Sequence, residues 1–249
     1  MFKFFRKIRY NLMGQNKTGK YFKYAIGEII LVVVGILIAL WLNNLNLKSQ
    51  QRIEEINILK GLKKDFQEDI IDFKLNINAY KNISSSVDLV LNSLESSAIY
   101  NDSLDYYFSG TITWPRSIIN KNSFDVLKSK GLDLISNDSL RNEILNFHGQ
   151  VYAGIKTWED QFNRDIYFNE MLKRFDKVEP WKFDKDGKFY RGVMKPINYN
   201  ALKTDTLYLS LLRTMKRDAE TLLYSEYLTT IKDLKSLVAD IDKELINIE

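Results

Sequence analysis

An uninterrupted apolar run between Tyr24 and Leu42 constrains this chain more than any other part of its sequence. The run reads YAIGEIILVVVGILIALWL, and from Ile29 onward it contains no charged residue. The hydrocarbon core of a bilayer is about 30 Å thick and needs about 20 apolar residues in a helix. Tyr24 and Trp41 stand near the two ends, where amphipathic aromatic rings favour the membrane interfaces. The sequence therefore predicts one transmembrane helix over residues 24–42.

Basic residues are concentrated before this run. Seven of the 36 Lys and Arg residues lie in residues 1–27, which contain no Asp or Glu. Short flanks rich in Lys and Arg remain cytoplasmic. We therefore expect a basic amphipathic segment over residues 1–23 on the inner membrane surface and an extracytoplasmic domain over residues 43–249. Ala39-Leu40-Trp41 lacks the small residues of a signal-peptidase site, so an uncleaved anchor is favoured over a cleaved signal peptide.

Composition excludes several classes of chemistry. The chain has no Cys and a single His, which excludes disulfides, thiol nucleophiles and most zinc or Ser-His-Asp sites. Outside residues 1–27 the chain holds 29 basic and 32 acidic residues, so its charge does not indicate nucleic-acid binding. No glycine-rich phosphate loop or nucleophile elbow is present. The acids are plentiful enough to form a carboxylate dyad, but nearly all are expected to lie on solvated helix faces opposite the apolar stripe. These observations predict a protein without cofactor or metal that is not an enzyme.

Four residues of the apolar run are candidates for contact with the membrane or with a partner helix. Glu28 lies about one turn inside the run, where it is either an intramembrane carboxylate that pairs with another subunit or a shallow Glu reached by cytoplasmic water. Gly35 and Ala39 form a small-xxx-small pair, and Gly27 adds a small position two turns earlier. Such spacing permits close approach of a second helix, so the expected partners are the lipid bilayer and either other membrane proteins or a second copy.

The N-terminal residues resemble a known family. FFRKIRYNLM followed by KTGKYFKYAIGEIILVVVGILIALWLNN resembles the head of an uncharacterised family of single-pass bacterial membrane proteins with a domain of unknown function. The resemblance covers about the first 45 residues, and the segment Ser123–Ile144 is similar more loosely. Trp41 departs from the family, in which a more polar residue is expected. The resemblance implies a bacterial inner-membrane protein with an N-terminus in the cytoplasm and a domain in the periplasm, and it implies no catalytic residue.

The segment from Lys48 to Ser96 has the three-four apolar spacing of a long amphipathic helix. We expect this helix to continue from the membrane helix and to be weakened at Ser84-Ser85-Ser86. Its apolar stripe comprises Ile56, Leu59, Leu62, Phe66, Ile70, Phe73, Ile77, Tyr80, Val87, Leu91 and Leu94.

A repeated tetrapeptide marks three helix starts. Asn101-Asp102-Ser103-Leu104 recurs as Asn137-Asp138-Ser139-Leu140 and, in altered form, as Thr204-Asp205-Thr206-Leu207. Each copy offers an N-cap residue and an acid in the first turn. The first start predicts a short helix that ends near Gly110. A further short helix is expected over Ser123–Lys130, closed by Gly131, after an irregular stretch from Thr111 to Pro115.

The second start predicts a long helix from Asp138 to Phe175. His148 lies on its apolar seam, where it is either a pH-sensitive or catalytic group or, as we favour, a buried side chain with one hydrogen-bond partner. The seam comprises Ile144, His148, Val151, Ile155, Trp158, Phe162 and Ile166.

The third start predicts a last helix from Asp205 to Asn247, whose apolar stripe skips a step between Leu222 and Ile231. Between the two helices, the strand-like pairs around Asp186-Gly187 predict a β-hairpin. Asp184-x-Asp186-Gly187 also matches half of a calcium loop, but the remaining ligands are missing.

Together these patterns predict an all-α fold, in which a single transmembrane helix precedes an elongated antiparallel helical bundle with a small β-hairpin insertion. Two functions remain open. The first is a non-enzymatic membrane-anchored scaffold or accessory subunit of an envelope complex. The second is an extracytoplasmic ligand-sensing module, in which Trp158, Trp181 and tyrosine-rich stretches would line a pocket. With about 23 cytoplasmic residues, such a sensor would act through a partner's membrane helix.

Overall fold

The structure is a computed structural model and is mostly helical. The chain divides into two compact units, residues 1–55 and 56–249, which are considered separately. The structure describes residues 18–161, 164–179, 182–186 and 188–249. Most of the predicted basic amphipathic segment, together with Phe162, Trp181 and Gly187, therefore lies outside the described residues.

One helix, α2, begins at Thr18 and ends at Glu95, so it contributes to both units. In the first unit, every residue from Ile29 to Leu42 is exposed. This helix is the one element in the described part of the chain that is long and apolar enough to cross a membrane. A helix that is apolar on all sides and covered by no protein has the composition of a membrane span.

In the second unit, α2 is apolar on one side only. Ten of the eleven predicted stripe residues from Ile56 to Leu94 are buried, and Ile56 is half-buried. The predicted amphipathic helix is thus confirmed. Ser84-Ser85-Ser86 does not interrupt it.

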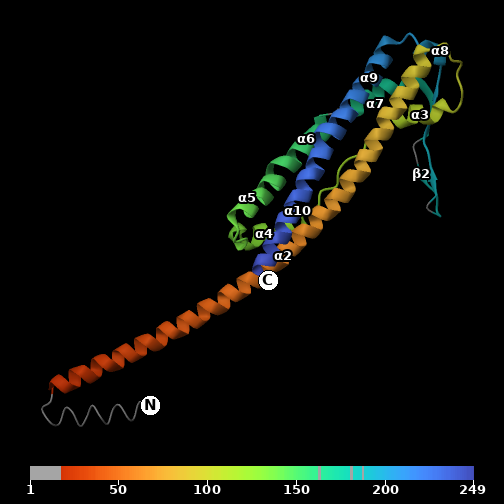
Figure 1. Ribbon diagram of the computed structural model, residues 1–249. Helices are drawn as coiled ribbons and strands as arrows, with labels where there is room; N and C mark the ends of the chain where they lie inside the picture. Colours follow the sequence, from red (N-terminus) through yellow and green to blue (C-terminus); the bar gives the residue numbers. More distant parts are fainter. Residues whose placement is uncertain (1–17, 162–163, 180–181, 187) are drawn as a thin grey trace. The chain divides into compact units, whose positions relative to one another are not determined.

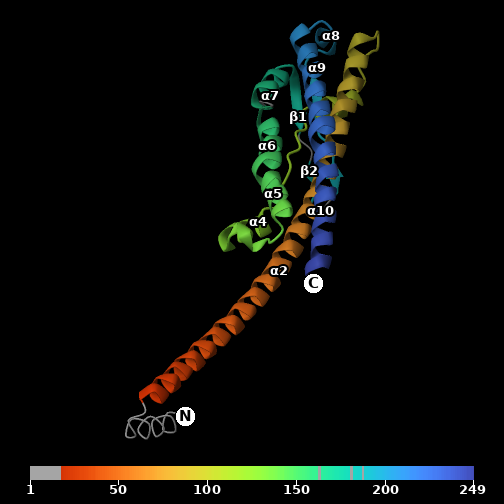
Figure 2. The same ribbon diagram turned by 60° about the vertical axis from the view of Figure 1, so that its left-hand side comes forward.

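The last helical segment packs antiparallel to α2. It comprises α9 (Thr206–Thr221), the π-helix η3 (Leu222–Tyr227) and α10 (Leu228–Ile248). Ion pairs between the two segments show that they are antiparallel. As the residue number increases along α2, the number of its partner near the C-terminus decreases. The pairs are Lys60–Glu249 at 2.6 Å, Lys63–Asp242 at 2.5 Å and Asp88–Lys216 at 2.6 Å. Figures 1 and 2 both show α9 and α10 alongside this part of α2.

A third helical segment runs in the same direction as α2. It comprises α5 (Asp138–Asn146), the π-helix η2 (Phe147–Val151), α6 (Tyr152–Gln161) and α7 (Arg164–Leu172). Aromatic pairs join it to α2 in rising order, Phe66 with Phe147 at 6.2 Å between ring centroids and Phe73 with Tyr152 at 6.3 Å. The predicted helix from Asp138 is observed to Leu172 within the described residues, but it contains a π-turn and ends before Phe175. Phe175 begins a strand because the chain leaves the bundle after Leu172.

Short elements connect these segments. They are α3 (Leu104–Thr111), α4 (Asn122–Lys130), the 3₁₀-helix η1 (Leu132–Leu134) and α8 (Tyr199–Leu202). Gly131 has φ +107° and its N–H donates to the carbonyl of Leu127, so it closes α4 as predicted. Asn137 caps α5, whereas α9 is capped by Asp205, one position after the equivalent residue. Ser103, the N-cap of α3, makes no side-chain cap bond.

Four short strands lie between α7 and α8. The predicted hairpin is confirmed as β2 (Lys182–Phe183) paired antiparallel with β3 (Phe189–Tyr190). A second, separate antiparallel pair, which the sequence did not predict, is formed by β1 (Phe175–Glu179) and β4 (Val193–Pro196). The Phe175 ring packs 5.3 Å from that of Phe108, so these strands are fastened to α3.

Candidate functional site

The four candidate contact residues lie on the first-unit part of α2. Gly27, Gly35 and Ala39 are exposed, and Glu28 is half-buried. A Cβ atom added to Gly27 or Gly35 would meet nothing within 4 Å among the described atoms. Within the described part of the chain, the surface at Gly27, Gly35 and Ala39 is therefore open to lipid or to another helix.

A second candidate is a row of acids on α2 in the domain of residues 56–249. Asp65, Asp69 and Asp72 are spaced by four and three residues, so they share one helix face. Asp65 is 5% exposed, Asp69 is 1% exposed and Asp72 is half-buried. The expectation that the acids are mostly solvated was wrong here, because these side chains have backbone donors to satisfy.

Each of these acids binds one backbone N–H of a segment that we call the strap, residues 117–123, which is irregular up to Lys121 and ends in the first turn of α4. Ser123 N–H donates to Asp65 at 2.8 Å, Asn120 N–H to Asp69 at 2.8 Å and Ile118 N–H to Asp72 at 2.9 Å. The strap therefore runs antiparallel to α2. The carboxylates supply the acceptors that a neighbouring strand would supply in a sheet, so these N–H groups have partners although no strand pairs with the strap.

A fourth acid holds the start of the strap from α6. Glu159 is fully buried and accepts the Ser117 N–H at 2.8 Å, the Tyr227 hydroxyl at 2.6 Å and the Lys156 ammonium at 3.1 Å. Lys156 also donates to the carbonyl of Ser117. One carboxylate thus joins the strap, α6 and η3, and the lysine balances its charge.

The pKa of Asp69 is strongly raised. Burial raises its pKa to about 6, although the bonds from the Tyr152 hydroxyl and from Asn120 N–H lower it in part. The Tyr152 hydroxyl lies 2.6 Å from Asp69 and also has a raised pKa, mainly through burial. Burial raises the pKa of Asp72 as well. The folded state therefore prefers Asp69 protonated, and this preference is lost as the pH rises through about 6.

His148 lies beside this network, in η2. It is 8% exposed, and the Phe124 ring stacks on it at 3.9 Å and 8°. The prediction of a buried histidine is confirmed, but the expected hydrogen bond is not, since neither ring nitrogen has a partner within the described part of the chain. Burial, with nearby Lys121, lowers its pKa to about 4. At neutral pH it is an uncharged aromatic core residue.

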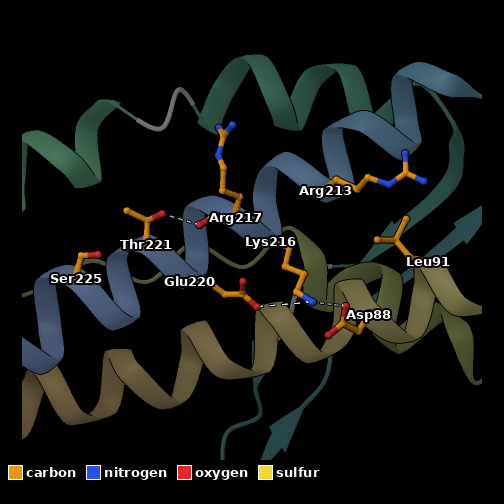
Figure 3. Close-up of a pocket in the computed structure, with 8 residues that line it drawn as sticks. All are labelled: Asp88, Leu91, Arg213, Lys216, Arg217, Glu220, Thr221 and Ser225. Atoms are coloured by element: carbon orange, nitrogen blue, oxygen red, sulfur yellow. Dashed lines mark hydrogen bonds and ion pairs between the residues drawn. The ribbon is translucent and has the colours of Figure 1, made fainter.

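An open groove of about 530 Å³ lies between α2 and α9 (Figure 3). Lys216 stands between Asp88, at 2.6 Å, and Glu220, at 3.7 Å. The other two cations also have acid partners, Arg213 with Glu95 at 2.7 Å and Arg217 with Asp218 at 2.8 Å. Because each charge is already neutralised, the groove is an interhelical ion-pair cluster rather than an anion-binding site.

Asp184, which begins the segment that matches half of a calcium loop, instead stabilises a turn. The Asp184 carboxylate accepts the N–H groups of Asp186, at 3.0 Å, and Lys188, at 2.8 Å. These bonds, chiefly the one from Lys188, lower the pKa of Asp184. In the described ranges, no group of three His, Asp or Glu side chains is arranged to hold a metal ion.

Comparisons with protein-family models, with curated proteins and with solved structures found no match to this chain. The resemblance of the N-terminal residues to a membrane-protein family therefore stays a prediction.

Sequence reasoning missed the buried acids, although a signal was present. Glu159 follows Ile155 by four residues and so fits the apolar seam as well as Trp158 does. Trp158, which was placed on the seam, is 39% exposed. An acid in phase with an apolar stripe, opposite a segment without regular structure, indicates a buried acceptor for backbone donors.

We predict that Glu159→Ala destabilises the domain by about 3–5 kcal/mol, because it leaves the Ser117 N–H and the Tyr227 hydroxyl without their acceptor and removes the acid partner of Lys156. Asp160→Ala is the matched control. Asp160 is the next residue, and its pair with Arg116 is exposed, so we expect about 0.5 kcal/mol or less. Urea unfolding of the full chain in detergent, followed by tryptophan fluorescence, measures both. Equal losses would contradict the assigned role of Glu159.

Proposed function

We propose that this chain is a non-enzymatic, membrane-anchored scaffold or accessory subunit of a bacterial envelope complex. Residues 24–42 cross the inner membrane, residues 1–23 remain cytoplasmic, and the helical domain lies in the periplasm. The observation that carries the proposal is the exposed apolar surface of α2 from Ile29 to Leu42.

The size of that surface supports a membrane. All fourteen residues are apolar or glycine and all are exposed. Soluble monomers rarely expose a contiguous apolar patch of more than a few hundred Å². Each exposed Leu or Ile side chain gains about 1.5–3 kcal/mol when it leaves water. Lipid is the partner that covers all sides of such a helix, and the basic residues before it favour the proposed orientation.

The titratable groups of the domain support a role without catalysis. His148 is covered by aromatic rings, and the buried acids Asp65, Asp69 and Glu159 already accept backbone N–H groups. A catalytic acid or base needs an open path to a substrate. Buried acids that hold backbone are a means of fixing an irregular segment in a bundle.

Ligand sensing is the second candidate, and it calls for a closed and roomy pocket. The groove of Figure 3 is open and internally neutralised. A hollow lined by Ile112, Trp114 and Met215, among others, has a volume of only about 10 Å³, which is close to a single water molecule. Neither hollow favours sensing over the scaffold function.

Charges placed within the apolar run test the anchor. We predict that the double substitution Val33→Arg and Leu37→Arg releases the protein from membranes washed at alkaline pH, because two arginines near the centre of a span cost roughly 5–7 kcal/mol. Leu45→Arg with Leu47→Arg is the control, since both residues are exposed on α2 beyond the run. The control protein should stay in the pellet. Retention of both variants would count against a spanning helix.

The scaffold role predicts that the protein forms a stable complex. After affinity purification from native membranes in mild detergent, we expect a complex larger than one chain by native mass measurement, with defined co-purifying proteins or further copies. A strictly monomeric particle from native membranes would contradict the scaffold role.

A further inference from the structure

The strap and α4 cover two buried titratable side chains of opposite type. The Asn120 N–H donates a hydrogen bond to Asp69, and the Phe124 ring stacks on the His148 ring. Tyr152 joins the two sites, because its hydroxyl donates to Asp69 at 2.6 Å and its ring meets His148 edge-on at 5.2 Å. Any opening that lifts the strap and the start of α4 from α2 would hydrate both groups together.

We propose that the strap and α4 form a proton-linked latch in which Asp69 and His148 act in opposite directions. Proton uptake by Asp69 holds the latch shut, whereas proton uptake by His148 opens it. The two effects largely cancel, so the latch of the unaltered chain stays shut over a range of acidity in which either group alone would make it a switch. This inference does not depend on the proposed membrane function.

The geometry at Asp69 explains why the latch remains closed when this acid is protonated. Asn120 N–H binds one carboxylate oxygen, and the Tyr152 hydroxyl binds the other. A proton on the second oxygen can be donated to the tyrosine oxygen, so that the hydrogen bond persists with its direction reversed. The bond from the strap is unaffected. When the latch opens, Asp69 meets water and regains the ordinary acidity of a carboxyl group, so the closed state binds the proton more tightly.

The geometry at His148 gives the opposite sign. Its ring lies against Phe124 on one side and Phe66 at 5.5 Å, and its nitrogens have no acceptor among the described residues. An imidazolium ion has two N–H donors and a full charge, which this apolar enclosure does not satisfy. In the open state the ring is hydrated and takes up a proton readily, so acid favours opening.

The surrounding charges do not override this assignment. Asp65 and Asp72 of α2 both disfavour ionised Asp69. At His148, Lys121 and Lys128 disfavour the imidazolium, while Asp65 and Asp125 favour it. Lys156 and Glu159 of α6 face Asp72. Burial is the dominant influence at both Asp69 and His148.

Hydrogen exchange over a pH series tests the proposal on the full chain in detergent micelles. The readout is the opening constant of strap amides, from peptides that cover residues 117–123, after correction for the intrinsic pH dependence of exchange. The design is a double-mutant cycle of Asp69→Asn and His148→Phe, with Asp133→Asn as a matched control because the Asp133 side chain is fully exposed. Asn mimics the protonated acid, and Phe keeps a stacked neutral ring. His148→Gln replaces Phe if the larger ring prevents folding.

The pKa values of about 6 for Asp69 and about 4 for His148 in the closed state, against ordinary values in the open state, determine the expected change. Between pH 7.5 and pH 5, the opening constant should rise about threefold in the unaltered chain and in the control. The same values predict about a 30-fold rise for Asp69→Asn, about a tenfold fall for His148→Phe, and no pH dependence for the double variant. Opposite slopes in the two single variants would support the proposal. Slopes of the same sign, or slopes equal to that of the unaltered chain, would overturn it.

Discussion

The removal of apolar side chains from water along a single helix organises this structure. Where α2 is apolar on one side, from Ile58 to Leu94, that side is covered by α5, α6, α9 and α10 and forms the core of the domain. Where α2 is apolar on all sides, from Ile29 to Leu42, no described residue covers it. The same helix thus carries the two kinds of apolar surface that proteins use, one satisfied by protein and one suited to lipid.

The strap contains backbone N–H groups that find no acceptor within a regular helix or sheet. A segment that does not pair within a helix or a sheet leaves its backbone N–H groups without their usual acceptors. Here four acids from α2 and α6 take one strap N–H each, at 2.8–2.9 Å. Buried carboxylates are costly when unpaired, so this arrangement fixes the register of the strap against α2. It also places a titratable acid beside the one histidine of the chain.

The helical fold could be predicted from sequence because the apolar periodicity is strong and the caps are local. The stripe of α2, the ends of α4 and the hairpin followed from this. The two π-helices did not, although the skip between Leu222 and Ile231 was a sign of η3, since an extra residue in a turn shifts the apolar phase. The strands β1 and β4 pair residues far apart in sequence, so local patterns do not specify them. The buried acids were missed because solvation is the usual fate of Asp and Glu, and because the donors that they bind come from residues at least 42 positions away.

The proposed function depends on where the helical domain lies, and the absence of Cys from the chain makes this measurable. A single Asn247→Cys substitution places a thiol on an exposed position of α10, and, in a second variant, Asn16→Cys places one before the apolar run. Spheroplasts are treated with a membrane-impermeant maleimide before and after lysis. We predict that the thiol at position 247 is labelled before lysis and that the thiol at position 16 is labelled only afterwards. Labelling at position 247 only after lysis would contradict the proposed anchor and orientation.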